Sequence, residues 1–203
     1  MDGKIDRIKK WLDIGSINIF GIPMSGKDTV GKQLAEVLDG KFLSSGEIIR
    51  EMEAESGEHT TDDGSFTPTN MFYKWVLPYF EKRELWHSPL ILSSIGRWAG
   101  EENEVMRIAE ESDHPIKAVV WLKISQEELE KRWNAAKQSG DRGNRADDQN
   151  LDIMKNRLNN FEEKTLPVLK HYEELGMLIV VDANAPREEV FERVINQLSD
   201  FCA

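Results

Sequence analysis

Short apolar runs alternate with amphipathic helical patterns along nearly the whole chain. Five of these runs have the length and the Val, Ile and Leu content of strands buried on both faces. They occupy residues 17–20, 41–43, 89–95, 116–124 and 177–182. The alternation predicts a three-layer α/β sandwich around a five-stranded parallel sheet with right-handed crossovers. In such a sheet, ligands bind at the carboxyl ends of the strands.

The start of the chain has a helical period. Ile5, Ile8, Trp11 and Leu12 recur at the spacing of one helix face. Residues 1–15 are therefore predicted to form an N-terminal helical extension that packs on the domain. A helix that binds a partner is the second interpretation of the same pattern.

Two segments are too long or too polar for simple crossovers. Residues 45–84, between the second and third strands, carry two helical patterns around a polar centre at 56–68 and predict a helical insertion over the sheet edge. Residues 137–149 are highly charged and predict a short lid, reached from a helix that begins at a capping box formed by Ser125 and Glu128.

A long helical pattern follows the predicted lid, from about residue 149 to residue 175. Pro167 interrupts it, because proline has no N–H to donate, and Gly176 is a typical stop signal after the last turn.

Composition narrows the class of partner. The chain has 203 residues, enough for one domain, with a formal net charge of −11 and a pI near 4.9. Nucleic acid and anionic membranes are not expected as partners, so any anion site must be a local pocket of basic residues. The single cysteine, Cys202, excludes an internal disulfide, and no stretch approaches the roughly 20 apolar residues of a membrane span. We expect a cytoplasmic protein.

A glycine-containing loop between the first strand and the next helix is the strongest chemical signal. Gly21 directly follows the strand, and Gly26 and Lys27 precede a helical pattern. Glycines let successive backbone N–H groups point inward, the helix adds its positive end, and the lysine reaches the β- and γ-phosphates. The sequence thus predicts a P-loop NTPase fold over residues 1–203. The predicted ATP-binding residues of the loop are Gly21, Ile22, Pro23, Met24, Ser25, Gly26, Lys27, Asp28 and Thr29.

The loop resembles that of the adenylate kinase family of nucleoside monophosphate kinases, which reads G-x-P-x-x-G-K-x-T. The similarity continues in order along the chain. "FLSSGEIIR" (42–50) is similar to the segment that opens the family's monophosphate-binding subdomain, and "LSSIGRW" (92–98) is similar to its D-G-F-P-R. The lid and closing segments of the family resemble residues 143–149, 155–161, 165–169 and 181–194.

This resemblance implies a single P-loop kinase domain that transfers the γ-phosphate of ATP, with Mg²⁺, to a nucleoside monophosphate. The insertion would bind the monophosphate and the lid would close over the donor; the short lid is similar to that of monomeric members. The implied catalytic residues are Lys27, Arg97, Arg145 and Arg157. The implied monophosphate-binding residues are Ser45, Gly46, Arg50, Arg97 and Glu101. Arg132 would lie against the donor base, and Arg142 offers a second guanidinium fork in the lid.

Two other functions agree with the same residues. One is a P-loop kinase for a different small acceptor, because fold and phosphate grip do not specify the acceptor. The other is a nucleotide-binding protein that has lost catalysis and acts through a partner.

Three residues depart from the family pattern. Ser93 replaces the aspartate that ends the third strand and helps to hold hydrated Mg²⁺, and Ala136 replaces a lid arginine. Glu101 replaces a glutamine that reads the acceptor adenine. A carboxylate accepts hydrogen bonds but donates none, which favours guanine or cytosine over adenine.

Asp28 is the fourth departure, because the family usually has glycine after the lysine. In one interpretation the metal carboxylate has moved from the Ser93 position to Asp28, with Ser93 acting through water. In a second, Asp28 only complements the helix dipole, an effect under about 1 kcal/mol. In a third, its charge repels the phosphates when no metal is bound.

Overall fold

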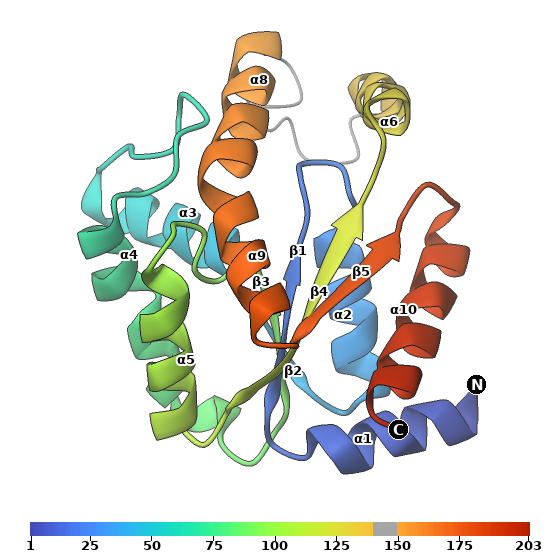
Figure 1. Cartoon of the computed structure of the whole chain (residues 1–203). Helices are drawn as coiled ribbons and strands as arrows, with labels where there is room; N and C mark the ends of the chain where they lie inside the picture. Colours follow the sequence, from blue (N-terminus) through green and yellow to red (C-terminus); the bar gives the residue numbers. More distant parts are fainter. Residues whose placement is uncertain (140–149) are drawn as a thin grey trace.

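All five predicted strands form one parallel sheet in the computed structural model, which describes residues 1–139 and 150–203 (Figure 1). The strands are β1 (Ser16–Phe20), β2 (Lys41–Ser44), β3 (Leu90–Ser93), β4 (Ile116–Lys123) and β5 (Leu178–Asp182). Their order is β2-β3-β1-β4-β5, and every neighbouring pair is parallel. The predicted α/β P-loop fold is confirmed.

Helices cover both faces of the sheet (Figure 1). On one face, α2 (Lys27–Val37), α10 (Arg187–Phe201) and α1 (Asp2–Leu12) share a hydrophobic cluster with Ile17 and Ile19 of β1. On the other face, α3 (Ser45–Ser56), α4 (Thr69–Trp75), α5 (Glu101–Glu111) and α9 (Leu166–Glu174) pack on Leu90 and Leu92 of β3. Every residue of β1 and β3 is buried, as expected for central parallel strands.

The N-terminal helix α1 is part of this core. Ile8 and Leu12 are fully buried, and the Lys4 ammonium donates to Asn196 Oδ1 of α10 at 2.7 Å. The Trp11 ring meets the Phe201 ring edge-on, with 5.9 Å between centroids. The apolar face of α1 is therefore occupied by the domain itself.

Helix α6 (Gln126–Ser139) starts at Ser125, but only half of the predicted capping box forms. Glu128 N donates to Ser125 Oγ at 3.2 Å, as expected for an N-cap. The Glu128 carboxylate instead accepts from Arg132, and Ser125 N donates to Asn184 Oδ1 at 2.8 Å. Arg142, Arg145 and most of the predicted lid at 137–149 lie outside the described residues.

The long helical stretch continues through Pro167 as three joined segments. A π-helical turn, η3 (Phe161–Thr165), links α8 (Leu151–Asn160) to α9, and Pro167 lies in the first turn of α9. Proline has no N–H to donate to the preceding turn, and the wider π-helical turn before it lets the helix continue without a break. Gly176, at φ 70°, lies in the left-handed region two residues past the last helical residue.

The insertion between β2 and β3 contains α3, α4 and two 3₁₀ turns, η1 (Leu77–Glu81) and η2 (Arg83–Leu85). Its apolar side chains join the core, because Phe72, Trp75, Val76 and Phe80 are all at most 4% exposed. Residues 57–68, which make up nearly all of the polar centre recognised at 56–68, connect α3 to α4. In the described part of the chain, no helix is long and apolar enough to cross a membrane.

A buried asparagine in the central strand fixes the loop after β3. Asn18 Nδ2 donates to Ile95 O at 2.8 Å, and Asn18 Oδ1 accepts from Ile95 N at 3.3 Å. Both residues are fully buried, so these backbone groups have no access to water. Asn18 thereby sets the start of the loop that carries Arg97.

We predict that Asn18→Leu lowers the free energy of unfolding by about 2–3 kcal/mol, because leucine fills the same space but leaves the N–H and C=O of Ile95 unpaired. Urea denaturation followed by circular dichroism measures the change. Asn134→Leu, on the exposed surface of α6, is the matched control and should stay within about 0.5 kcal/mol of the unmodified protein. Equal stability of both variants would contradict the role given to Asn18.

Candidate active site

Two cavities meet at the carboxyl ends of the strands. The central cavity lies beneath the insertion, between the end of β3 and helix α8. The outer cavity lies between α6 and the loop of residues 184–187. Lys27 and Asp28 line both of them, so the two spaces join at the start of α2. A ligand in each cavity would have one end beside the same lysine.

The loop of residues 21–26 joins β1 to α2 through tight backbone contacts. A Cβ at Gly21 would lie 2.9 Å from Leu122 O and still closer to Ser25 Oγ, so only glycine fits. Gly26, at φ 88°, is left-handed and directly precedes Lys27, the first residue of α2. The first N–H groups of α2 therefore face the junction of the cavities, as in an anion-binding loop.

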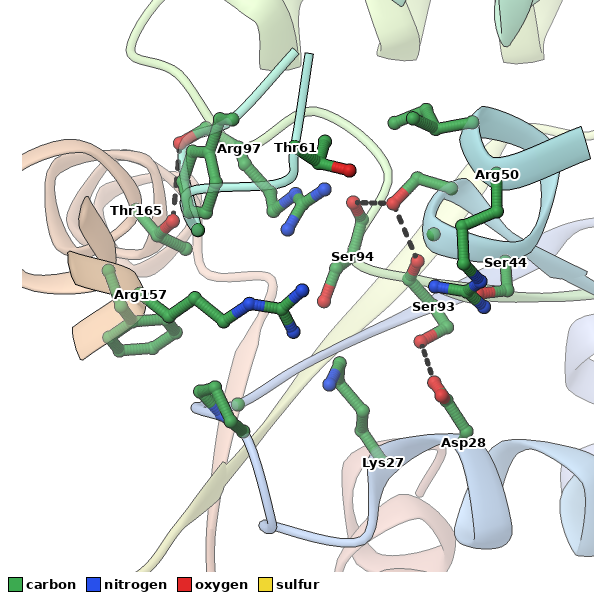
Figure 2. Close-up of a pocket in the computed structure, with 18 of the residues that line it drawn as sticks. Lys27, Asp28, Ser44, Arg50, Thr61, Ser93, Ser94, Arg97, Arg157 and Thr165 are labelled. Carbon is green, nitrogen blue, oxygen red and sulfur yellow. Dashed lines mark hydrogen bonds between the residues drawn. The ribbon is translucent and has the colours of Figure 1, made fainter. Parts of the chain in front are cut away.

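Four cationic side chains from four elements line the central cavity (Figure 2). They are Lys27 of α2, Arg50 of α3, Arg97 from the loop after β3, and Arg157 of α8. Burial, together with the charge of Arg157, lowers the pKa of Arg97 to about 10, which leaves it cationic at neutral pH. In a chain of net charge −11, this is the local concentration of positive charge that an anion site requires.

Phe66 covers the Arg97 guanidinium. The ring centroid lies 4.3 Å from Arg97 Cζ, and Phe66 is 8% exposed. A guanidinium stacked on an aromatic face keeps its edge N–H groups for a ligand, because the stacking uses the plane of the group. The sequence analysis did not select Phe66; a single aromatic residue within the polar stretch 56–68 was the available signal.

Asp28 and Ser93, the two departures from the family pattern, are in direct contact. Ser93 Oγ donates to Asp28 Oδ1 at 2.6 Å (Figure 2). Ser93 is buried at the end of β3, and Asp28 lies in the first turn of α2. The hydrogen bond fixes the carboxylate between the strand end and the loop, beside Lys27.

Glu101, which the resemblance places at the acceptor base, is not among the residues that line the central cavity. It is 3% exposed, and its carboxylate accepts from Thr69 Oγ1 at 2.7 Å, Arg97 N at 2.9 Å and Trp98 N at 3.1 Å. Burial raises the pKa of Glu101 while these bonds oppose the rise. Glu101 therefore holds the Arg97 loop against the start of α4.

Arg132 ties together three segments around the outer cavity. It donates to the Glu128 carboxylate, to Met24 O and Ser25 O of the loop, and to Ala183 O and Ala185 O after β5. The five bonds equal the donor capacity of a guanidinium, so only its planar face remains for stacking on a ligand. Ala136, which departs from the family pattern, also lies on α6 and lines this cavity.

Most of the predicted residues line one or both of the two cavities. Ile22 lines neither and packs against both hydrophobic clusters. Five hydroxyl residues of the central cavity were not selected from the sequence: Ser44, Thr61, Ser65, Ser94 and Thr165. The predicted residues that line the central cavity are Gly21, Pro23, Lys27, Asp28, Ser45, Gly46, Arg50, Ser93, Arg97 and Arg157. Those that line the outer cavity are Met24, Ser25, Gly26, Lys27, Asp28, Thr29 and Arg132.

Comparison with known proteins finds similarity to adenylate kinases and to a UMP-CMP kinase. The family model described as adenylate kinase matches residues 19–177. The chain is 29% identical to UMP-CMP kinase 1 of Oryza sativa subsp. japonica, over 87% of this chain and 70% of that protein. It is 29% identical to the adenylate kinase of Thermus thermophilus, over 90% and 97% of the two chains. The adenylate kinase of Schistosoma mansoni is 27% identical, over 91% and 93%.

We predict that Arg132→Lys lowers the free energy of unfolding by about 1–3 kcal/mol, because an ammonium donates at most three hydrogen bonds and cannot reach all five acceptors. Urea denaturation provides the measurement. Arg107→Lys is the control, since Arg107 pairs with Glu104 and Glu111 on the surface of α5, where an ion pair contributes little to the free energy of unfolding. A loss no larger than that of the control would show that Arg132 does not join these segments.

Proposed function

Because the chain belongs to the adenylate kinase family, we propose that it is a nucleoside monophosphate kinase that transfers the γ-phosphate of ATP to a nucleoside monophosphate. The observation that carries the proposal is the convergence of Lys27, Arg50, Arg97 and Arg157 on the central cavity, which joins the outer cavity at Lys27. Two ligands whose phosphates meet at one cationic centre are what phosphoryl transfer requires.

The outer cavity suits the donor. The base and ribose of ATP would lie between α6 and residues 184–187, with the base against the face of Arg132, and the triphosphate would follow the loop to Lys27. The first N–H groups of α2 and the Lys27 ammonium would then neutralise the β- and γ-phosphates.

The central cavity suits the acceptor. Arg50 and Arg97 would grip the monophosphate by paired N–H groups, and Arg157 would reach the transferring group from α8. We assign Arg145 and Arg142 of the lid the same task from the donor side. The attacking phosphate oxygen is already ionised, so the protein aligns the two phosphates, spreads their charge and excludes water rather than removing a proton.

Asp28 fits the role of a carboxylate that orients Mg²⁺. The described residues contain no cluster of three His, Cys, Asp or Glu side chains, so the ion would be held chiefly by ATP oxygens and water. The Ser93 hydroxyl donates to the Asp28 carboxylate and directs it toward the strand end, where the family has its carboxylate. Mg²⁺ bound with ATP would neutralise phosphate charge. We therefore favour relocation of the carboxylate over a purely helix-capping role.

We propose no single acceptor base. The relatives bear the names adenylate kinase and UMP-CMP kinase, and Glu101, on which the preference for guanine or cytosine depended, is engaged by Thr69 and the Arg97 loop. The proposal therefore names the class, a nucleoside monophosphate.

The function is tested with ATP, Mg²⁺ and a panel of AMP, CMP, UMP, GMP and the deoxynucleoside monophosphates, with diphosphate formation as the measurement. We expect turnover of at least one of them, and a loss of about 10²-fold in kcat/KM for Arg97→Lys, since an ammonium cannot replace the guanidinium fork. Arg193→Lys, at an exposed ion pair on α10, is the control and should leave kcat/KM unchanged. ATP binding without turnover of any monophosphate would favour the non-catalytic protein, and turnover of another small acceptor would favour the other P-loop kinase.

The metal role is tested with Asp28→Asn. We expect the Mg²⁺ concentration that gives half-maximal ATP turnover to rise about tenfold, because the side chain loses its charge but keeps its size. The double variant Asp28→Asn with Ser93→Asp returns a carboxylate to the strand end and should recover most of this loss. An unchanged or lower Mg²⁺ requirement in Asp28→Asn would refute the relocation and leave Asp28 as a helix-start residue.

A further inference from the structure

The turn of residues 57–68 is bonded to helix α8 across the central cavity. Asn156 Nδ2 donates to Asp63 O at 3.0 Å, and Asn160 Nδ2 donates to Gly64 O at 3.3 Å. The two asparagines are four residues apart, so they lie on one face of α8, one helical turn from each other. Figure 1 shows the loop between α3 and α4 rising beside α8. Segments about 95 residues apart in the sequence are thereby joined.

The contact requires a glycine in the turn. Gly64 has φ +85°, and a Cβ added there would lie 2.6 Å from Ile153 O and 3.2 Å from Ile153 Cγ2. The backbone of the turn therefore packs directly on the backbone of α8, at a distance that no other residue allows.

The opposite side of the turn is fixed by a buried carboxylate. Glu53 of α3 is 7% exposed, and its Oε1 accepts from Thr60 N at 2.7 Å and Thr61 N at 3.0 Å. The hydroxyl groups of both threonines also donate to this carboxylate. Asp63 Oδ1 accepts from Ser65 N at 2.9 Å within the turn. The segment is thus a defined structure held from both sides.

The turn contacts two of the arginines that line the cavity. Phe66, near its end, lies on the Arg97 guanidinium at 4.3 Å. Arg157 lies between the two asparagines in α8, and its Cγ would be 3.3 Å from a Cβ on Gly64. The position of the turn therefore determines what surrounds both guanidinium groups.

We propose that Asn156 and Asn160 are positioning residues that hold the 57–68 turn over the central cavity. The inference rests on the proposed function, because it assigns this role toward the nucleoside monophosphate. When the turn is held in this position, Phe66 rests on Arg97 and Gly64 packs against Arg157. Acceptor binding then does not include the entropic cost of ordering the turn. The acceptor therefore binds more tightly than it would to a protein whose turn is mostly open.

The test is the double variant Asn156→Ala with Asn160→Ala, with Asn159→Ala, at an exposed position of the same helix, as the matched control. Two hydrogen bonds are lost, so we expect the Kd of the best acceptor of the panel, measured by calorimetry, to rise on the order of tenfold. The Kd of ATP should not change. In the protein without ligand, amide hydrogen exchange at residues 60–66 should become faster in the double variant only.

Gly64→Ala is a second variant and should reproduce both effects, because its methyl group would point at Ile153 O rather than into the cavity. Exchange and acceptor affinity equal to those of the Asn159→Ala control would overturn the proposal. Faster exchange with unchanged acceptor affinity would also overturn it, since the contact would then only stabilise the fold. If no monophosphate binds, the proposed function fails, whereas the exchange of residues 60–66 still decides whether the asparagines hold the turn.

Discussion

Burial of both faces of the parallel sheet is the constraint on which the rest of this structure depends. Parallel strands hydrogen-bond to one another only if each connection returns over a face of the sheet, so helices cover both sides and the loops gather at the strand ends. At the carboxyl edge this brings together Lys27 after β1, Ser45 after β2 and Arg97 after β3. The position of the site therefore follows from the packing of the core. Asn18 connects core and site directly, because it hydrogen-bonds the central strand to the loop that carries Arg97.

The concentration of positive charge at this edge is electrostatically unfavourable within the protein. Burial and the proximity of Arg157 depress the pKa of Arg97, which means that the charged form is less favourable there than in water. Phe66 stacks on the guanidinium, and the Asp28 and Glu101 carboxylates offset part of the repulsion. Phosphate groups would complete this compensation, so the cavity is electrostatically prepared for anions in a chain that is acidic as a whole.

The buried carboxylates of Glu53 and Glu101 organise irregular backbone segments. Glu53 binds the N–H groups of Thr60 and Thr61, and Glu101 binds those of Arg97 and Trp98. In each case a charged acceptor satisfies donors of an irregular segment that has no ladder or helix to do so. Both segments border the central cavity, and their rigidity places the residues that a ligand would meet.

The five strands, their parallel arrangement and the phosphate loop could be predicted from the sequence, because they depend on local periodicity and on glycines next to a lysine. It also indicated that Asp28 and Ser93 belong together, although only the fold could bring these residues, 65 positions apart, into one hydrogen bond. Tertiary structure alone decided that Glu101 accepts from Thr69, that Arg132 donates to backbone carbonyls, that Phe66 lies on Arg97, and that Asn156 and Asn160 donate to the 57–68 turn. The physical reason is that a side chain's partners are set by which distant segments the packing brings within about 3 Å, and no local pattern records that distance.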